Sequence, residues 1–244
     1  MSAEPGGLRP KVQHLATLAR RRARGLPRSF DELEATLSLM SDLRRWGWHD
    51  SVRAHRAQMM GEPVPWLTYP AVIALGRALT GAESVFEIGA GVSTLWFAAH
   101  AACVVSLEGD AAWAAELRPR LPENAELLVH PYSDAEGFFA KLDGIFGSFD
   151  VVLVDGGPDR SRVCRRAADF IADDGLIVLD NSDVSAYQPG IDGLAERGFH
   201  RIDFHGPAPA TRYLGCTSFF SRRLDRWSPG KGSVWPRPIY EADR

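Results

Sequence analysis

The feature that most constrains this chain is a regular alternation of short apolar runs and amphipathic segments. The apolar runs lie at residues 84–88, 103–107, 126–129, 150–154 and 176–179, and a helical pattern follows each of them. Nearly all-apolar strands that alternate with amphipathic helices indicate a parallel sheet covered on both faces. Two further strands, 200–204 and 217–221, have only a loop between them and are expected to pair antiparallel. The pattern predicts a Rossmann-like, doubly wound α/β fold of seven strands, mostly parallel, with an antiparallel last strand.

The first 70 residues do not follow this pattern, and we interpret them as a basic arm and a helical cap. Residues 9–28 carry seven Arg and Lys residues and no acidic residue. The sequence Ser29-Phe30-Asp31-Glu32 has the form of a capping box, and the helix after it is expected to bury Phe30, Leu33 and Leu37. Residues 61–70 form a Pro-rich connector, and residues 71–244 form the main domain. Trp46 and Trp48, near the end of the cap helix, are candidates for a homodimer contact.

Composition narrows the classes of partner. The net charge is −3 over 244 residues, whereas proteins that grip nucleic acid usually carry a basic excess. A nucleic-acid substrate is therefore not expected, and a small-molecule substrate is favoured. The three cysteines, Cys103, Cys164 and Cys216, have no zinc-site spacing, and burial is expected for Cys103 and Cys164. With no apolar run long enough to span a bilayer, these features favour the cytoplasm.

The first chemical signal is a glycine turn between a strand and a helix. It contains Gly89, Ala90, Gly91 and Thr94, and a helix that begins after glycines offers free backbone N–H groups to a carboxylate or phosphate. Glu108 ends the next strand, where an acidic residue can accept both hydroxyls of a ribose. These residues fit a nicotinamide dinucleotide and S-adenosylmethionine (SAM) equally well.

Glu87 helps to separate the two cofactors. It lies inside the strand, two residues before Gly89, where a carboxylate would attract the cationic end of SAM and repel a pyrophosphate. The segment VFEIGAGVSTLWFA at residues 85–98 resembles motif I of class I SAM-dependent methyltransferases. Further segments resemble a bacterial small-molecule group of that family: PWLTYPAVIAL, VDGGPDRSRVC, LDNSDVSAY, GFHRIDFHGPAP and CTSFFSRR.

The resemblance implies roles for particular residues. Glu87, Gly89 and Gly91 would contact the methionine part of SAM, and Glu108 the ribose. The loop at residues 132–134, including Ser133, would lie near the adenine. Thr68 and Tyr69 would contact cofactor or substrate, since segments there often fold over SAM in this superfamily. Residues 71–244 would then be the SAM-binding methyltransferase domain.

Carboxylates at two further strand ends form the second signal. Asp155 ends the fourth strand, and Asp180 and Asn181 end the fifth, so all three should converge on the ligand crevice. The set is similar to the metal site of catechol and caffeoyl-CoA O-methyltransferases, which implies Mg²⁺ bound by Asp155, Asp180 and Asn181. The alternative is a metal-free site in which Asp155 is the general base. Arg160 and Arg162 are candidates for binding an anionic substrate group or for ion pairs.

The leading prediction is a SAM-dependent methyltransferase that methylates a small molecule, at a hydroxyl oxygen, with or without Mg²⁺. Two alternatives stay open: an NAD-dependent oxidoreductase, and a SAM-binding regulatory protein without turnover.

Overall fold

The structure is a computed structural model that describes residues 27, 29–145 and 147–227. Contacts divide the chain into two compact units, Met1–Arg45 and Trp46–Arg244. The described part of the first unit is dominated by helix α2 (Phe30–Arg45), where Ser29 Oγ accepts a hydrogen bond from Glu32 N at 3.1 Å, as the capping motif predicts. No residue of α2 is buried, and Phe30 is 77% exposed. The expected burial of Phe30, Leu33 and Leu37 is therefore wrong, because helical periodicity predicts an apolar face but not that another element covers it.

The second unit begins with short elements that the sequence pattern did not distinguish. Helix α3 (Trp48–Ala54) is followed by a two-stranded antiparallel sheet of β1 (Gln58–Met59) and β2 (Glu62–Pro63). Trp46 and Trp48 are half-buried within this unit: Trp46 packs edge-on against Tyr69, and Trp48 Nε1 donates a hydrogen bond to Thr211 O. Both side chains, which we expected to form a homodimer contact, therefore already make contacts within their own unit.

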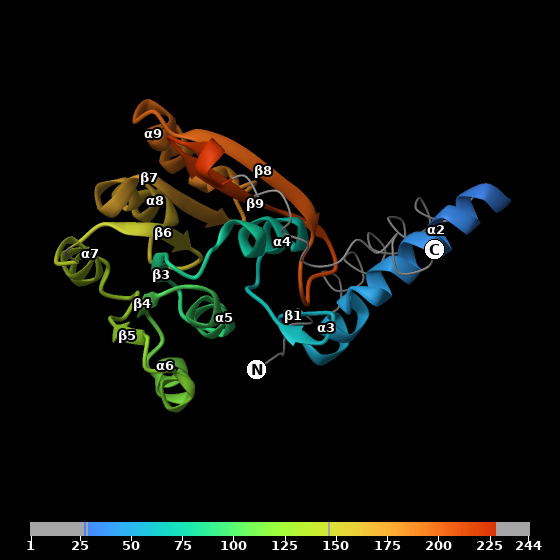
Figure 1. Cartoon of the computed structure of the whole chain (residues 1–244), viewed down its shortest axis with the longest axis horizontal. Coiled ribbons are helices and arrows are strands. Elements are labelled where there is room, and N and C mark those ends of the chain that lie inside the picture. Colours follow the sequence, from blue (N-terminus) through green and yellow to red (C-terminus); the bar gives the residue numbers. More distant parts are fainter. Residues whose placement is uncertain (1–26, 28, 146, 228–244) are drawn as a thin grey trace, which may run out of the picture. The chain divides into compact units, whose positions relative to one another are not determined.

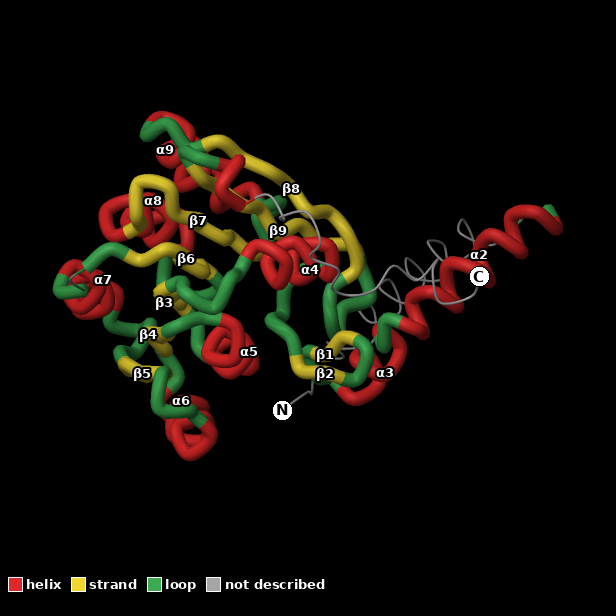
Figure 2. Tube along the Cα trace, viewed as in Figure 1, coloured by secondary structure: helices red, strands yellow, loops and turns green. Residues whose placement is uncertain are grey.

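The main sheet has seven strands in the order β5-β4-β3-β6-β7-β9-β8. Strands β3 to β7 are parallel to one another, while β9 is antiparallel to both β7 and β8, as predicted. Figures 1 and 2 show the helices flanking this sheet. The strands are β3 (Ser84–Ile88), β4 (Cys103–Glu108), β5 (Ala125–Val129), β6 (Phe149–Val154), β7 (Ile171–Asp180), β8 (His200–Pro207) and β9 (Leu214–Ser221). The helices are α4 (Tyr69–Ala78), α5 (Val92–His100), α6 (Ala111–Leu117), α7 (Ala135–Asp143), α8 (Arg160–Phe170) and α9 (Gln188–Glu196).

Alternate residues of the central strands face two separate cores. In β6, Val152 and Val154 pack with α7, α8 and α9, whereas Val151 and Leu153 pack with α4 and α5. Because both faces of these strands are buried, most of their positions are apolar. The carboxyl ends of β3, β4, β6 and β7 consequently meet at one edge of a rigid sheet.

The burial of the cysteines and the character of the helices can be compared with what the sequence predicts. Cys164 is buried as expected, but Cys103, the first residue of β4, is exposed. Among the residues that the structure describes, no helix has the length and apolar character needed to cross a membrane.

Candidate active site

The glycine turn after β3 is held in place from two sides. Gly89 has φ +95°, a conformation that favours glycine, and a Cβ atom there would lie 3.1 Å from the backbone carbon of Asp155. On the other side, Thr94 Oγ1 accepts a hydrogen bond from Gly91 N at 3.0 Å and donates one to Glu87 Oε2 at 2.5 Å. Thr94 therefore stabilises the turn from within helix α5.

Glu87 lies beneath this turn and is completely buried. Its Oε2 accepts a second hydrogen bond, from Ser106 Oγ at 2.7 Å, while Oε1 has no partner among the described residues. Burial raises the pKa of Glu87 from 4.5 to about 7, although its hydroxyl partners oppose the rise. Glu87 does not line either of the two cavities described below, and its hydrogen bonds to Thr94 and Ser106 support the turn from beneath.

A cavity of about 1010 Å³ opens above the turn, and we call it the cofactor cavity. Gly89, Ala90 and Gly91 line it, together with Glu108 at the end of β4. The carboxylate of Glu108 is oriented by three backbone N–H groups, from Ala90 (2.8 Å), Gly109 (2.7 Å) and Asp110 (2.7 Å). Two carboxylate oxygens accept about four hydrogen bonds, so Glu108 retains capacity for a ligand.

Two aromatic side chains complete this part of the cofactor cavity. Trp113 lines it and donates a hydrogen bond from Nε1 to Ala90 O at 2.8 Å. Tyr132 also lines it, and its buried hydroxyl has no partner in the described part of the chain. Its ring and hydroxyl fill space that a Cβ atom would need at Gly109 (2.3 Å) or at Gly156 (2.5 Å).

Other residues expected at the cofactor lie elsewhere. Ser133 is exposed and does not line the cofactor cavity, and its neighbour Asp134 caps α7 by accepting a hydrogen bond from Gly137 N. Tyr69 is fully buried, and its hydroxyl donates to Gln58 O at 3.0 Å. Thr68 lines a second cavity, described below.

The strand-end acids converge as predicted, but an arginine lies between them. Arg160, the first residue of α8, donates from Nη2 to Asp155 Oδ1 at 3.1 Å and from Nη1 to Asn181 Oδ1 at 3.1 Å. It also donates to the backbone oxygen of Asp155. Asp180 Oδ1 accepts a hydrogen bond from Thr217 Oγ1 at 2.7 Å.

Burial raises the pKa of both carboxyl groups. Burial and then the charge of Asp180 hold the pKa of Asp155 well above its usual range, and Arg160 opposes the rise. Burial raises the pKa of Asp180 to about 6, and the hydrogen bond from Thr217 opposes that rise. Carboxyl groups with these properties can exchange protons near neutral pH.

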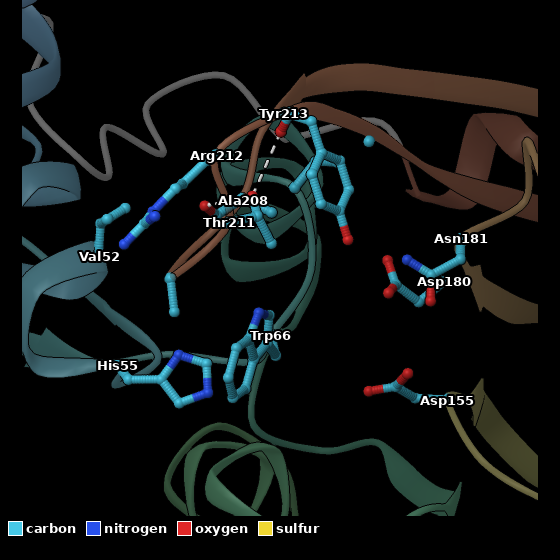
Figure 3. A pocket seen from close by; sticks show the side chains of 13 residues that line it. Val52, His55, Trp66, Asp155, Asp180, Asn181, Ala208, Thr211, Arg212 and Tyr213 are labelled. Atoms are coloured by element: carbon cyan, nitrogen blue, oxygen red, sulfur yellow. Dashed lines mark hydrogen bonds between the residues drawn. The ribbon is translucent and has the colours of Figure 1, made fainter. Parts of the chain in front are cut away.

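A second cavity, of about 770 Å³, adjoins the first, and we call it the acceptor cavity. Both cavities are lined by Asp155, His55 and Trp66. Figure 3 shows the acceptor cavity, with Asp155, Asp180 and Asn181 on one side and Arg212 and His55 on the opposite side. Asp155 therefore stands where the two cavities meet.

A comparison with protein families identifies this arrangement. Residues 86–182, which run from β3 through the Asp180-Asn181 pair, match a family described as a methyltransferase domain. This stretch of the chain is therefore similar to a methyltransferase domain. This match confirms the resemblance to class I SAM-dependent methyltransferases, and it does not fit the NAD-dependent oxidoreductase alternative.

Several solved structures are similar to the chain at low sequence identity. The structure of cofactor-bound Rv0187 from MTB is 19% identical and covers 72% of this chain and 88% of its own, with a TM-score of 0.50. The O-methyltransferase TomG from Streptomyces achromogenes, in complex with SAM, is 21% identical (61% and 77% covered, TM-score 0.49). A putative O-methyltransferase from Klebsiella pneumoniae is 18% identical (57% and 73% covered, TM-score 0.47). No curated protein matches the chain.

Sequence reasoning missed several residues of the methyltransferase site. The bridge from Arg160 to Asn181 requires knowledge of how α8 packs beside β7, which spacing does not supply. Trp66 and His55 come from the segment before α4, and no local motif marks them. Trp113, from α6, also lines the cofactor cavity.

Proposed function

We propose that this methyltransferase transfers the methyl group of SAM to a hydroxyl oxygen of a small molecule. The observation that carries the proposal is the position of Asp155, a carboxylate with a raised pKa at the junction of the cofactor and acceptor cavities. A group there can contact the reacting atoms of both ligands. We further propose that it acts in the cytoplasm.

The cofactor cavity fits SAM. Its volume lies near the upper end of the usual range for small-molecule sites, and Glu108 would accept hydrogen bonds from the ribose hydroxyls. Trp113 and Tyr132 also line the cavity and would contact the cofactor through their rings. SAM supplies an electrophilic methyl group, which forms a bond to the acceptor oxygen as its bond to sulfur breaks.

Asp155 would receive the proton that the acceptor hydroxyl loses. Its raised pKa improves it as a base for this purpose, since an ordinary aspartate binds a proton too weakly near neutral pH. Arg160 fixes the orientation of the carboxylate through Oδ1 and the backbone oxygen. Asp180 lines the same cavity and is held by Thr217, so it can orient the acceptor hydroxyl beside Asp155.

The three residues expected to bind Mg²⁺ do not fit a metal site in this arrangement. The guanidinium group of Arg160 already occupies oxygen atoms of Asp155 and Asn181, at 3.1 Å each. A divalent cation bound to the same oxygens would be repelled by this positive charge at short range. We therefore propose a metal-free reaction in which Arg160 supplies the balancing charge.

Calorimetry with the purified chain tests the cofactor assignment. S-Adenosylhomocysteine should bind, NAD should not, and Glu108→Ala should weaken S-adenosylhomocysteine at least about tenfold, as expected for loss of charge-assisted hydrogen bonds. Glu126→Ala, at an exposed position of β5, is the matched control. Binding of NAD in preference to S-adenosylhomocysteine would refute the proposal.

The remaining alternative, a SAM-binding regulatory protein, is tested with Asp155→Asn. This variant keeps an oxygen for Arg160 but cannot accept the proton. We expect it to bind S-adenosylhomocysteine like the wild type and to lose methyl transfer by about 100-fold or more, the contribution typical of a general base. Asp173→Asn, at an exposed position of β7, should retain activity. Equal turnover by Asp155→Asn and wild type would remove Asp155 from the mechanism.

A further inference from the structure

The acceptor cavity has two chemically different ends. Asp155 and Asp180 mark one end, where the cofactor cavity joins it, and Figure 3 shows Arg212 on the opposite side. The rings of Trp66 and Tyr213 lie between these ends (Figure 3). The cavity therefore has an acidic end, an aromatic middle and a cationic end.

The aromatic middle is open to a ligand. Trp66 is 38% exposed and Tyr213 is 69% exposed, although both line a cavity. The Trp66 ring is supported from the side by the ring of His55, with centroids 5.2 Å apart in an edge-on arrangement. Exposed aromatic rings that flank a cavity gain buried area and stacking contacts when a flat apolar molecule enters.

Arg212 forms the cationic end, and its charge has no counter-ion among the described residues. No ion pair or side-chain hydrogen bond joins Arg212 to another residue in the described part of the chain, whereas most arginines of α8 are paired with carboxylates. A guanidinium group is always charged near neutral pH and matches a carboxylate or phosphate in geometry. An anionic group on the ligand would supply the missing partner.

The loop that carries Arg212 is fixed against helix α3. Ala210 N donates to Ser51 Oγ at 2.6 Å, and Trp48 Nε1 donates to Thr211 O at 3.0 Å. Ser51 is fully buried and also donates to Arg56 O. The backbone immediately before Arg212 is therefore anchored to α3, which gives the cationic end a defined place relative to the cavity.

We propose that the acceptor is a flat, largely apolar molecule with a hydroxyl group at one end and an anionic group at the other. The hydroxyl lies beside Asp155, the body lies between Trp66 and Tyr213, and Arg212 binds the anionic group. The orientation of the hydroxyl rests on the proposed methyl transfer, but recognition of the anion does not. The acidic end disfavours the reverse orientation, because the anion would then face Asp155 and Asp180.

Calorimetry with two pairs of probes tests this inference in the presence of S-adenosylhomocysteine. The probes are 4-hydroxybenzoate and 4-hydroxycinnamate, each compared with its neutral methyl ester, so that two lengths are sampled. At least one acid should bind the wild type about tenfold more tightly than its ester, as expected for one charge-assisted contact. Arg212→Gln should abolish this preference, and Arg223→Gln, at an exposed arginine outside both cavities, should keep it.

The outcomes separate this inference from the proposed function. If neither acid binds more tightly than its ester, or if Arg212→Gln retains the preference, the anion site is refuted. Methyl transfer is measured separately, as release of S-adenosylhomocysteine from SAM with each acid. Binding that depends on Arg212 without methyl transfer to either acid would uphold the anion site and count against hydroxyl methylation. Methyl transfer to an ester as fast as to its acid would refute the anion site and uphold the transferase.

Discussion

Replacement of Glu87 by glutamine tests the electrostatics beneath the glycine turn. Glu87 is fully buried, and both hydrogen bonds that it accepts, from Thr94 and Ser106, end on Oε2. The glutamine side chain has the same shape, and its oxygen can accept both bonds. Its NH₂ group would take the place of Oε1, which has no described partner. The substitution thus removes the charge while preserving the contacts.

The expected effect follows from the pKa of Glu87, which burial raises from 4.5 to about 7. A carboxyl group with a raised pKa holds its proton more tightly in the folded state, so it stabilises the fold at low pH and loses that contribution as the pH rises to about 7. The loss between pH 5 and pH 8 is about 2 to 3 kcal/mol. An unpartnered glutamine NH₂ costs roughly 1–3 kcal/mol at any pH. It therefore lowers the free energy of unfolding by the same amount at every pH and does not change the pH dependence.

Urea unfolding at pH 5, 6, 7 and 8, without cofactor, measures this difference. The free energy of unfolding of Glu87→Gln relative to wild type should rise by about 2 to 3 kcal/mol across the series. Comparison with wild type removes the contribution of Asp180 and most of that of Asp155, except for the part of the Asp155 shift that the charge of Glu87 causes. Glu126→Gln, at an exposed position of β5, controls for the loss of one negative charge. A constant difference between variant and wild type at all four pH values would refute the reasoning.

Three further predictions concern the site itself. Gly156→Ala places a Cβ atom 2.5 Å from the Tyr132 hydroxyl, so we expect about 1–3 kcal/mol of destabilisation, measured by urea unfolding, with weaker binding of S-adenosylhomocysteine. Because burial and Asp180 raise the pKa of Asp155, the rate of methyl transfer should fall as the pH decreases through a value well above the usual range for aspartate. A pH–rate profile that falls only near pH 4 would contradict this. Because Arg160 occupies oxygens of Asp155 and Asn181, EDTA should leave the rate of methyl transfer unchanged within about twofold. If EDTA abolished the activity and Mg²⁺ then raised the rate about tenfold, a metal ion would displace the guanidinium group.

The fold could be predicted from the sequence because strands that are buried on both faces have a recognisable apolar sequence. A strand such as β6, which packs into two cores, is apolar at nearly every position, and Asp150 near its start is the exception. The absence of a crossover helix between β8 and β9 likewise predicted their antiparallel pairing. Local patterns fail where burial depends on distant elements, as for Phe30 in α2 and Cys103 in β4.

The candidate site was predictable to the extent that strand ends define it. Asp155, Asp180 and Glu108 follow strands directly, and parallel strands bring such residues together. The partners of these residues were not predictable, because each partner comes from another element: Arg160 from α8 and Thr217 from β9. The same strand-end residues can therefore form either a site bridged by arginine, as between Asp155 and Asn181 here, or a Mg²⁺ site.

The attachment of the 208–213 loop to α3 has a consequence for how acceptor preference can change. Two hydrogen bonds join this loop to Trp48 and Ser51, residues about 160 positions earlier in the chain. If this loop alone were replaced by the loop of a related enzyme, the new loop would lack the α3 residues that hold its conformation. Successful exchange of acceptor preference should therefore require transplanting both segments together, and natural recombination would preserve them as a pair.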